Sequence, residues 1–405
     1  MGVVSCVGNN ITEYWDSLLN GRCGIDKVTY FDATEYRTQI AGQVKGFNIE
    51  KYMPLKEARK LDPFCQFAVA ASDEAMESAG IAKDLNGLNP ERVGVLVSSG
   101  IGGLKTLEEQ SAILKEKGPS RVSPFLIPMM IIDLASGNIS MRYGAKGPNM
   151  AIVTACATST HSIGEAFWMI KRDDADVMIA GGAEASITGV GFAGFCSMKA
   201  MTSNNADPKK ASRPFDLNRD GFIMSEGSGI IILEELEHAK KRGAKILAEL
   251  VGYGASSDAY HITAPAPGGT GAAQSIRSAL RVAKLPLNSI DYINAHGTST
   301  QLNDKLETEA YKSVFGQDAY KINISSIKGT VGHNLGAAGA IETICCVKTI
   351  MEGVVAPTIN YETPDPLCDL NYTPNKAVQK NVETALNMNL GFGGHNATLI
   401  IKKFK

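Results

Sequence analysis

Residues 322–351, INISSIKGTVGHNLGAAGAIETICCVKTIM, contain in order a short apolar run, a glycine-rich loop and a stretch with the apolar spacing of a helix. The run 322–326 favours a strand, and 337–351 has the length and periodicity of a helix. Glycines at the end of an apolar run allow the tight turn from a strand into a helix. This order of elements predicts an α/β fold.

The same pattern recurs along the chain. Several further runs are apolar almost throughout, which is typical of strands covered on both faces; they are 92–99, 177–181, 229–233, 292–295 and 397–402. Helical patterns alternate with them, at 67–78, after Cys156, at 272–282 and at 304–315. The sequence therefore predicts helices that cover both faces of the sheets.

The most highly charged segment, 234–250, lies between a predicted strand and the next apolar run, and no Ser/Pro-rich linker occurs there. A chain of 405 residues is expected to form two core units. We therefore place a boundary near residue 245 and predict two halves, 1–245 and 246–405, that pack as one body.

Composition excludes several classes of protein. With 44% hydrophobic and 20% charged residues, the chain has enough apolar surface to fold. Forty Lys and Arg against 42 Asp and Glu give a net charge of −2, so no overall positive field attracts nucleic acid. The longest apolar stretch, 125–135, is much shorter than the roughly 20 residues of a membrane span. We therefore expect neither a nucleic-acid partner nor a membrane.

The eight cysteines form no CxxC pair, and no histidine spacing typical of a metal site occurs. This pattern indicates a reducing compartment and predicts neither a disulfide framework nor a metal site. The N-terminal residues, MGVVSCVG, resemble neither a secretory signal nor an Arg-rich transit peptide. Any targeting segment is expected to be absent or already removed.

Cys156 lies in 152–161, IVTACATSTH, where an apolar run is followed by apolar positions at helical spacing. The cysteine is therefore expected on a turn from a strand into a helix. The positive end of a helix dipole and the free N–H groups there lower the pKa of a thiol, which predicts a nucleophile. The alternative interpretation is one more buried structural cysteine.

Two histidines follow predicted strands: His296 in 292–300, YINAHGTST, and His333 in the loop of 327–339. Open α/β sheets place ligand sites at the carboxyl ends of strands, although each histidine alone is more often structural. The loop is no P-loop, because Lys328 precedes the glycines and no Gly-Lys-Ser/Thr follows. A third glycine cluster, 390–396, either brings backbone N–H groups to a ligand or forms an ordinary turn. One cysteine and two histidines at strand ends indicate covalent thiol chemistry with oxyanion stabilisation.

Four motifs together resemble the β-ketoacyl-[acyl-carrier-protein] synthases of the thiolase superfamily: TACATSTHSIG around Cys156, NAHGTST around His296, SIKGTVGHNLGAAG around His333 and NLGFGGHN around Phe392. The intervals of 140 residues from cysteine to first histidine, 32 to Lys328 and 5 to the second histidine match the elongation-type enzymes, and the type II (KAS II) class fits best. AGGAEA, SRPFDLNRDGF and SSDAYH extend the resemblance over essentially the whole chain. Family members usually start with a strand that runs into a Gly-Val-Val turn. Because this chain opens at Met1, we expect part of that strand to be missing.

The resemblance implies a thiolase-like fold, in which two similar halves with five-stranded sheets stack as an α-β-α-β-α sandwich. It implies a homodimer without a cofactor, and acyl carrier protein (ACP) as the partner. The implied activity is that of an acyltransferase of fatty acid elongation, which condenses acyl-ACP with malonyl-ACP to 3-oxoacyl-ACP, free ACP and CO2. The implied location is the bacterial cytoplasm, or an organelle stroma or matrix after removal of a targeting segment.

Residue roles follow from the same resemblance. Cys156 would attack the acyl thioester, with the N–H groups of Cys156 and Phe392 as oxyanion hole. Neutral His296 and His333 would donate N–H groups to the enolate oxygen that develops when malonyl-ACP loses CO2. Lys328, with Glu342 as partner, would hold His333 in place.

The remaining implied residues bind the two substrates. Thr298 and Thr300 would hydrogen-bond the phosphopantetheine arm, while Phe392, Phe195 and Ile101 would gate or line the acyl pocket. Because ACP is acidic and this chain is nearly neutral, docking requires a local basic patch. The candidates for that patch are Arg59, Lys60 and Lys199.

The motifs distinguish the chain from proteins with related activities. A thiolase needs a second cysteine in the C-terminal glycine loop, which here reads GFGG. Initiating (type III) synthases pair their cysteine with His and Asn, whereas the loop of His333 supplies a second histidine. A non-catalytic chain-length partner lacks the nucleophile, which is present as Cys156. A polyketide ketosynthase and a KAS I-like elongating synthase remain as alternatives.

Overall fold

The computed structural model describes all 405 residues and contains two five-stranded mixed sheets. The strand order of the first sheet is β1 (Gly2–Ser5), β7 (Gly227–Glu234), β6 (Val177–Glu184), β4 (Val93–Ser98) and β5 (Asn149–Met150). The strand order of the second sheet is β8 (Glu249–Ser257), β14 (His395–Lys402), β13 (Thr384–Gly391), β9 (Tyr292–Asn294) and β10 (Asn323–Ser325). In each order the first three strands pair antiparallel and the last three parallel. This equivalence confirms the prediction of two similar halves.

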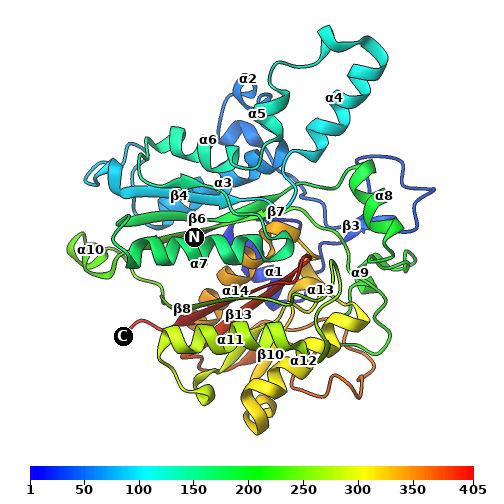
Figure 1. Ribbon diagram of the computed structural model, residues 1–405, viewed down its shortest axis with the longest axis vertical. Coiled ribbons are helices and arrows are strands. Elements are labelled where there is room, and N and C mark those ends of the chain that lie inside the picture. The colour runs from blue at the N-terminus through cyan, green and yellow to red at the C-terminus, as the bar shows by residue number, and fades with distance from the viewer.

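Helices form three layers around these sheets (Figure 1). The central layer contains α7 (Thr158–Lys171), which contacts β4, β6 and β8, and α14 (Ala338–Glu352), which contacts β7 and β13. Helices α3 (Pro63–Ser78) and α6 (Leu134–Tyr143) cover the outer face of the first sheet. Helix α11 (Thr270–Ala283) covers the outer face of the second sheet and packs against α12 (Gln301–Phe315). The predicted α-β-α-β-α sandwich is confirmed.

The other elements are short or lie outside the layers. The helices are α1 (Ile11–Leu19), α2 (Leu55–Ala58), α4 (Leu104–Lys117), α5 (Leu126–Met130), α8 (Gly189–Ser197), α9 (Pro208–Ala211), α10 (Leu236–Lys241) and α13 (Lys328–Val331). The strands are β2 (Asp26–Lys27), β3 (Ile40–Ala41), β11 (Val354–Val355) and β12 (Val378–Gln379). No helix has both the length and the apolar character needed to span a membrane.

The central helices are buried because both sheets cover them. Nearly every side chain of α14 is buried, which is expected of a helix packed on all sides. A Cβ atom at Gly339 would overlap the hydroxyl of Thr160 and lie 2.9 Å from the Thr160 nitrogen. Glycine at 339 therefore allows α14 to approach α7 closely, and this contact holds the two halves together.

All six predicted strands form at their predicted places, but the sequence interpretation missed β8 and β13. In β13 the polar residues Asn387 and Asn389 alternate with apolar ones, and in β8 glycines and serines interrupt the apolar run. Strand β13 is buried almost throughout, whereas β8 is a partly exposed edge strand, and in both the pairing depends on tertiary packing that the local pattern does not record. Strand β1 pairs with β7 over Gly2–Ser5. The predicted boundary near residue 245 falls between α10 and β8 and stays a prediction.

Candidate active site

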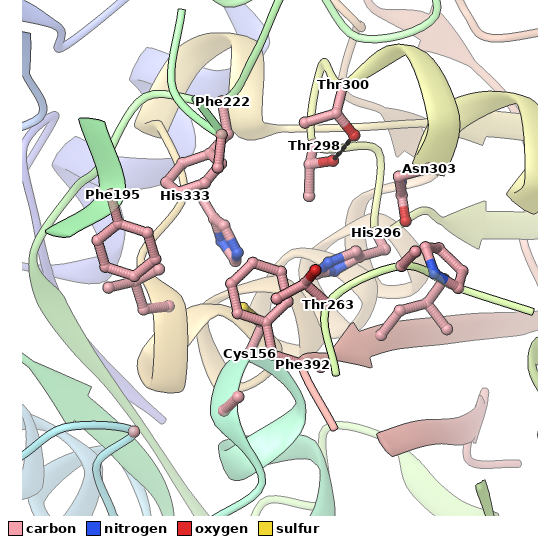
Figure 2. A pocket seen from close by; sticks show the side chains of 18 of the residues that line it. Cys156, Phe195, Phe222, Thr263, His296, Thr298, Thr300, Asn303, His333 and Phe392 are labelled. Atoms are coloured by element: carbon pink, nitrogen blue, oxygen red, sulfur yellow. Dashed lines mark hydrogen bonds between the residues drawn. The ribbon is translucent and has the colours of Figure 1, made fainter. Parts of the chain in front are cut away.

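Loops from both halves meet around one cavity of about 400 Å³ (Figure 2). Figure 2 shows Cys156, His296, His333 and Phe392 gathered around it, although they come from four separate segments of the chain. The other predicted pocket residues line the same cavity; they are Thr298, Thr300, Phe195 and Ile101. The structure thus brings together in one cavity eight residues that the motifs alone leave in separate segments of the chain.

Cys156 lies in a single helical turn, Ala155–Ala157, that leads directly into α7. The expected turn at the start of a helix is present, but the expected lowering of the thiol pKa is wrong. Burial, with a smaller contribution from the nearby Glu184 carboxylate, raises the pKa of Cys156 to about 12. The positive charge of Lys328 and the backbone N–H of Cys156 act in the opposite direction and do not compensate. Cys156 is therefore a neutral thiol at pH 7.

His296 and His333 face one another across the cavity, with ring centroids 5.3 Å apart and ring planes at 86°. Burial holds the pKa of both histidines well below the usual value of 6.5, and the positive charge of Lys328 lowers it further. Both rings are therefore neutral at pH 7. Neutral imidazoles can donate one N–H each to an oxyanion in the cavity.

Glu307 on α12 fixes the backbone that carries His296. Its two carboxylate oxygens accept hydrogen bonds from the His296 nitrogen at 2.6 Å and the Gly297 nitrogen at 2.8 Å. The hydroxyl of Tyr311 donates to the same carboxylate at 2.6 Å, and Asn303 donates at 3.2 Å. Sequence analysis missed Glu307. Its signal is a row of polar residues, 303, 307 and 311, at four-residue spacing on the helix that follows the His296 motif.

Lys328 and Glu342 lie behind the cavity rather than in its wall. They form an ion pair in which the Lys328 side chain is 1% exposed and that of Glu342 is 2% exposed. The predicted partnership of these two residues is therefore present in the structure. Asn389 donates a further hydrogen bond to Glu342 at 2.6 Å.

Glu184 joins the loop of His333 to the first half. This fully buried carboxylate, at the end of β6, accepts hydrogen bonds from the Gly100 nitrogen at 2.9 Å and the Gly336 nitrogen at 3.0 Å. The hydroxyls of Ser99 and Ser186 complete its partners. The loops after β4, β6 and β10 are thus held to one carboxylate at the rim of the cavity.

Three non-glycine residues with left-handed backbones lie beside the site side chains. They are Ala155 (φ 51°), Ser299 (φ 70°) and Leu335 (φ 46°). Such a conformation costs on the order of 1–3 kcal/mol and persists only where surrounding packing imposes it. The surrounding packing therefore imposes a strained backbone on each of the three loops that carry the cysteine and the two histidines.

The glycine cluster after β13 packs against the turn of Cys156. A Cβ atom at Gly391 would overlap the backbone oxygen of Thr154, so only glycine permits this approach. The backbone N–H of the next residue, Phe392, donates to no protein acceptor. The Phe392 N–H is therefore free to donate to a ligand in the cavity that Phe392 and Cys156 both line.

The basic residues predicted to dock a carrier protein lie outside the cavity. Arg59, Lys60 and Lys199 are exposed, and none of them forms an ion pair. Arg59 and Lys60 follow α2, and the ammonium of Lys60 lies 5.3 Å from the ring centre of Phe125. Lys199 follows α8, which Figure 1 shows apart from α2. Within one chain these three residues therefore lie in two separate basic patches of the surface.

Known proteins resemble the chain along its whole length. The β-ketoacyl synthase N-terminal domain model matches residues 1–239, and the C-terminal domain model matches residues 247–362. The 3-oxoacyl-[acyl-carrier-protein] synthase 2 of Synechocystis is 50% identical over 405 residues, which cover 100% of this chain and 97% of the relative. The enzyme with the same description from Staphylococcus aureus strain N315 is 49% identical with the same coverage.

Solved structures resemble the chain as well. A β-ketoacyl synthase from Burkholderia phymatum has a TM-score of 0.93 at 34% identity and covers 100% of this chain and 98% of its own. A type II polyketide synthase acyl-carrier protein in complex with its ketosynthase, AntDE:AntF, matches at a TM-score of 0.90 and 33% identity, with the same coverage. The family models, the full-length relatives and the shared fold agree, and the chain belongs to the β-ketoacyl synthase family.

Proposed function

We propose that this member of the β-ketoacyl synthase family is a 3-oxoacyl-[acyl-carrier-protein] synthase of type 2, which extends an acyl chain by two carbons in fatty acid synthesis. The observation that carries this proposal is the single cavity in which one thiol and two neutral imidazoles meet. The similarity to synthases 2, at 50% and 49% identity over the whole chain, supports the choice of substrates. The polyketide ketosynthase in AntDE:AntF is less similar, at 33% identity, which favours fatty acid elongation over the polyketide alternative.

In the first half-reaction, the sulfur of Cys156 attacks the thioester carbonyl of acyl-ACP. The N–H groups of Cys156 and Phe392 stabilise the tetrahedral oxyanion, and the phosphopantetheine thiolate then leaves. Because burial raises the pKa of the resting thiol, its proton departs only as the C–S bond forms. The leaving thiolate takes up the proton that the Cys156 thiol loses, so the step releases holo-ACP with a neutral thiol and leaves acyl-Cys156.

In the second half-reaction, malonyl-ACP loses CO2 and the electron pair of the broken C–C bond forms an enolate. His296 and His333 each donate an N–H to the enolate oxygen, which needs two donors because no positive group touches it. The enolate carbon attacks the acyl-Cys156 carbonyl, and the cysteine thiolate leaves and is protonated. The products are 3-oxoacyl-ACP and CO2.

Residues around these three groups position them and bind substrate. Burial lowers the pKa of both histidines, and Lys328, paired with Glu342, lowers it further, so both rings stay neutral. Thr298 and Thr300, whose hydroxyls lie 3.0 Å apart on the cavity wall, bind the phosphopantetheine arm. Three side chains line or gate the acyl end of the cavity: Ile101, Phe195 and Phe392.

The exposed residues Arg59, Lys60 and Lys199 contribute to docking of the acidic carrier protein. They lie at two separate places on one chain, so a homodimer would allow one carrier protein to contact both. Strand β5, at the edge of the first sheet, has an exposed Met150, and Val153 three residues later is exposed as well. An unpaired edge strand favours pairing with a second copy. Light scattering is expected to give twice the chain mass of 43.1 kDa. A monomer at micromolar concentration would contradict the homodimer.

The assigned histidine roles are tested by separating the two half-reactions. His333→Ala and His296→Ala are expected to form acyl-Cys156 from acyl-ACP but to lose about 10²- to 10³-fold in CO2 release from malonyl-ACP. Intact-mass acylation, labelled CO2 release and melting temperature are measured on the same samples. A folded His333→Ala protein that decarboxylates at the wild-type rate would refute its role. Joint loss of acylation and thermal stability would show that the histidines only support their loops.

A further inference from the structure

Asn389 on β13 connects His296 to the buried ion pair, a contact that the proposed chemistry does not use. Its side chain is fully buried, and each polar atom has a partner. The oxygen Oδ1 accepts a hydrogen bond from the hydroxyl of Thr160 at 2.5 Å. The nitrogen Nδ2 donates to Glu342 Oε2 at 2.6 Å and lies 3.3 Å from His296 Nδ1.

The neighbours of the Asn389 amide determine which of its ends faces the histidine. Lys328 pairs with the other carboxylate oxygen of Glu342, which favours the ionised carboxylate. A carboxylate only accepts hydrogen bonds, so an amide oxygen turned towards it would be repelled in this buried place. The Thr160 hydroxyl satisfies the amide oxygen on the opposite side. The amide nitrogen therefore faces both Glu342 and His296.

The orientation of the amide decides where the proton of His296 lies. Two N–H groups cannot face each other in a hydrogen bond, so His296 Nδ1 must present its lone pair to the Asn389 amide. A neutral imidazole has one ring proton, which then resides on Nε2. His333 differs, because its Nδ1 has no hydrogen-bond partner.

We propose that Asn389 is a positioning residue that fixes the tautomer of His296, with the proton on Nε2. The chain of contacts runs from Lys328 through Glu342 and the oriented Asn389 amide to His296 Nδ1. It makes His296 a donor before substrate arrives, so no proton has to move when the enolate forms. This inference rests on the donor role of His296 proposed above.

Asn389→Leu tests this inference, because leucine has a similar size and no hydrogen-bond donor. Asn389→Ala is the second variant, since its smaller side chain excludes a steric explanation. Asn387 supplies the matched control: it lies two residues earlier on the same face of β13, is equally buried, and donates to the Gly339 oxygen at 2.8 Å and the Thr343 hydroxyl at 2.9 Å. Asn387→Ala therefore removes a buried amide of the same strand that contacts neither His296 nor Glu342.

The direct readout is 15N NMR of the full-length protein with 15N-labelled histidine, in which the signals of the six histidines are assigned by single substitutions. In the wild type, His296 Nδ1 is expected to have a pyridine-like shift and Nε2 a pyrrole-like shift. In both Asn389 variants the Nδ1 shift is expected to move towards the pyrrole-like value, while Asn387→Ala leaves it unchanged. A protonated Nδ1 in the wild type would overturn the inference even if no variant folds.

Kinetics provide the second readout. Since a lost oxyanion donor costs about 10²- to 10³-fold, a mixed tautomer in the Asn389 variants is expected to slow decarboxylation of malonyl-ACP about 10- to 100-fold. Acylation of Cys156 is expected to stay within about threefold, because it uses backbone donors. Unchanged tautomer and decarboxylation in a folded Asn389 variant would overturn the inference, as would equal effects in Asn387→Ala. If His296→Ala instead decarboxylates at the wild-type rate, the donor role fails, while the tautomer shift still reports on Asn389.

Discussion

Removal of one partner of the Lys328–Glu342 pair is expected to destabilise the whole chain. Both side chains are almost fully buried, so Lys328→Met leaves the Glu342 carboxylate without its counter-charge in a place that water does not reach. Such a loss costs about 3–5 kcal/mol. The hydrogen bond from Asn389 to Glu342 remains and favours the lower end of this range.

The melting temperature gives the assay. At about 2.1 cal/mol/K per residue, the entropy of unfolding of a 405-residue chain is about 0.85 kcal/mol/K, so Lys328→Met is expected to lower Tm by about 4–6 °C. The double variant Lys328→Met/Glu342→Gln leaves no unpaired charge and is expected to recover at least half of that loss. Calorimetry of both variants and the wild type measures the difference.

An exposed pair serves as the control for this experiment. Lys305 and Glu309 lie 3.9 Å apart on α12, with side chains 40% and 39% exposed. Lys305→Met is expected to cost less than about 1 kcal/mol and to shift Tm by about 1 °C or less. Two results would contradict the expected effect of the buried charge. The first is a Tm of Lys328→Met equal to that of Lys305→Met, and the second is a double variant whose loss of Tm equals the sum of the losses in Lys328→Met and Glu342→Gln.

Further predictions concern the nucleophile, the histidines and the docking surface. Cys156→Ser and Cys156→Ala are expected to abolish condensation, and retained formation of 3-oxoacyl-ACP would end the mechanism. Because burial raises the pKa of Cys156 to about 12, alkylation by a neutral reagent is expected to rise about tenfold per unit from pH 7 to 10; a plateau near pH 7 would instead show the helix-lowered thiol. The two buried histidines bind protons below about pH 6.5 in the unfolded chain but not in the folded chain. The free energy of unfolding is therefore expected to fall below that pH by up to about 1.4 kcal/mol per pH unit for each histidine. A free energy of unfolding that is constant down to about pH 5 would contradict the burial of both histidines as neutral rings. Charge reversal of Arg59, Lys60 and Lys199 is expected to raise KM for acyl-ACP and weaken its salt dependence, but to leave a pantetheine thioester unaffected; equal losses with both substrates would show a structural patch.

The sequence predicted the residues that stand at strand ends. Cys156, His296 and His333 each follow a recognisable apolar run, and the carboxyl ends of parallel strands converge. The strands themselves were predictable for the same reason, because strands buried on both faces have nearly continuous apolar residues. Their meeting in one cavity required the two halves to stack, which the resemblance implied and the motifs alone did not.

Residues that act through tertiary contacts were not predictable. Glu184 and Asn389 each contact a loop whose sequence lies far from their own, and no local pattern marks such a pair. Glu307 lies only 11 residues after His296, and the polar row on α12 is its local signal. The prediction of a lowered pKa for Cys156 was wrong for a related reason. The helix start is a local feature that the sequence reveals, whereas the burial that outweighs it comes from side chains of both halves.

The central claim is that Cys156 carries the acyl group between the two half-reactions. Intact-mass and peptide-mapping measurements on the protein incubated with acyl-ACP, and then with carboxyl-labelled malonyl-ACP, test it in one experiment. The expected result is an acyl adduct on Cys156 that disappears when malonyl-ACP is added, with one labelled CO2 and one 3-oxoacyl-ACP formed per adduct lost. An adduct on another residue, or an acyl-Cys156 that persists while 3-oxoacyl-ACP accumulates, would contradict the account.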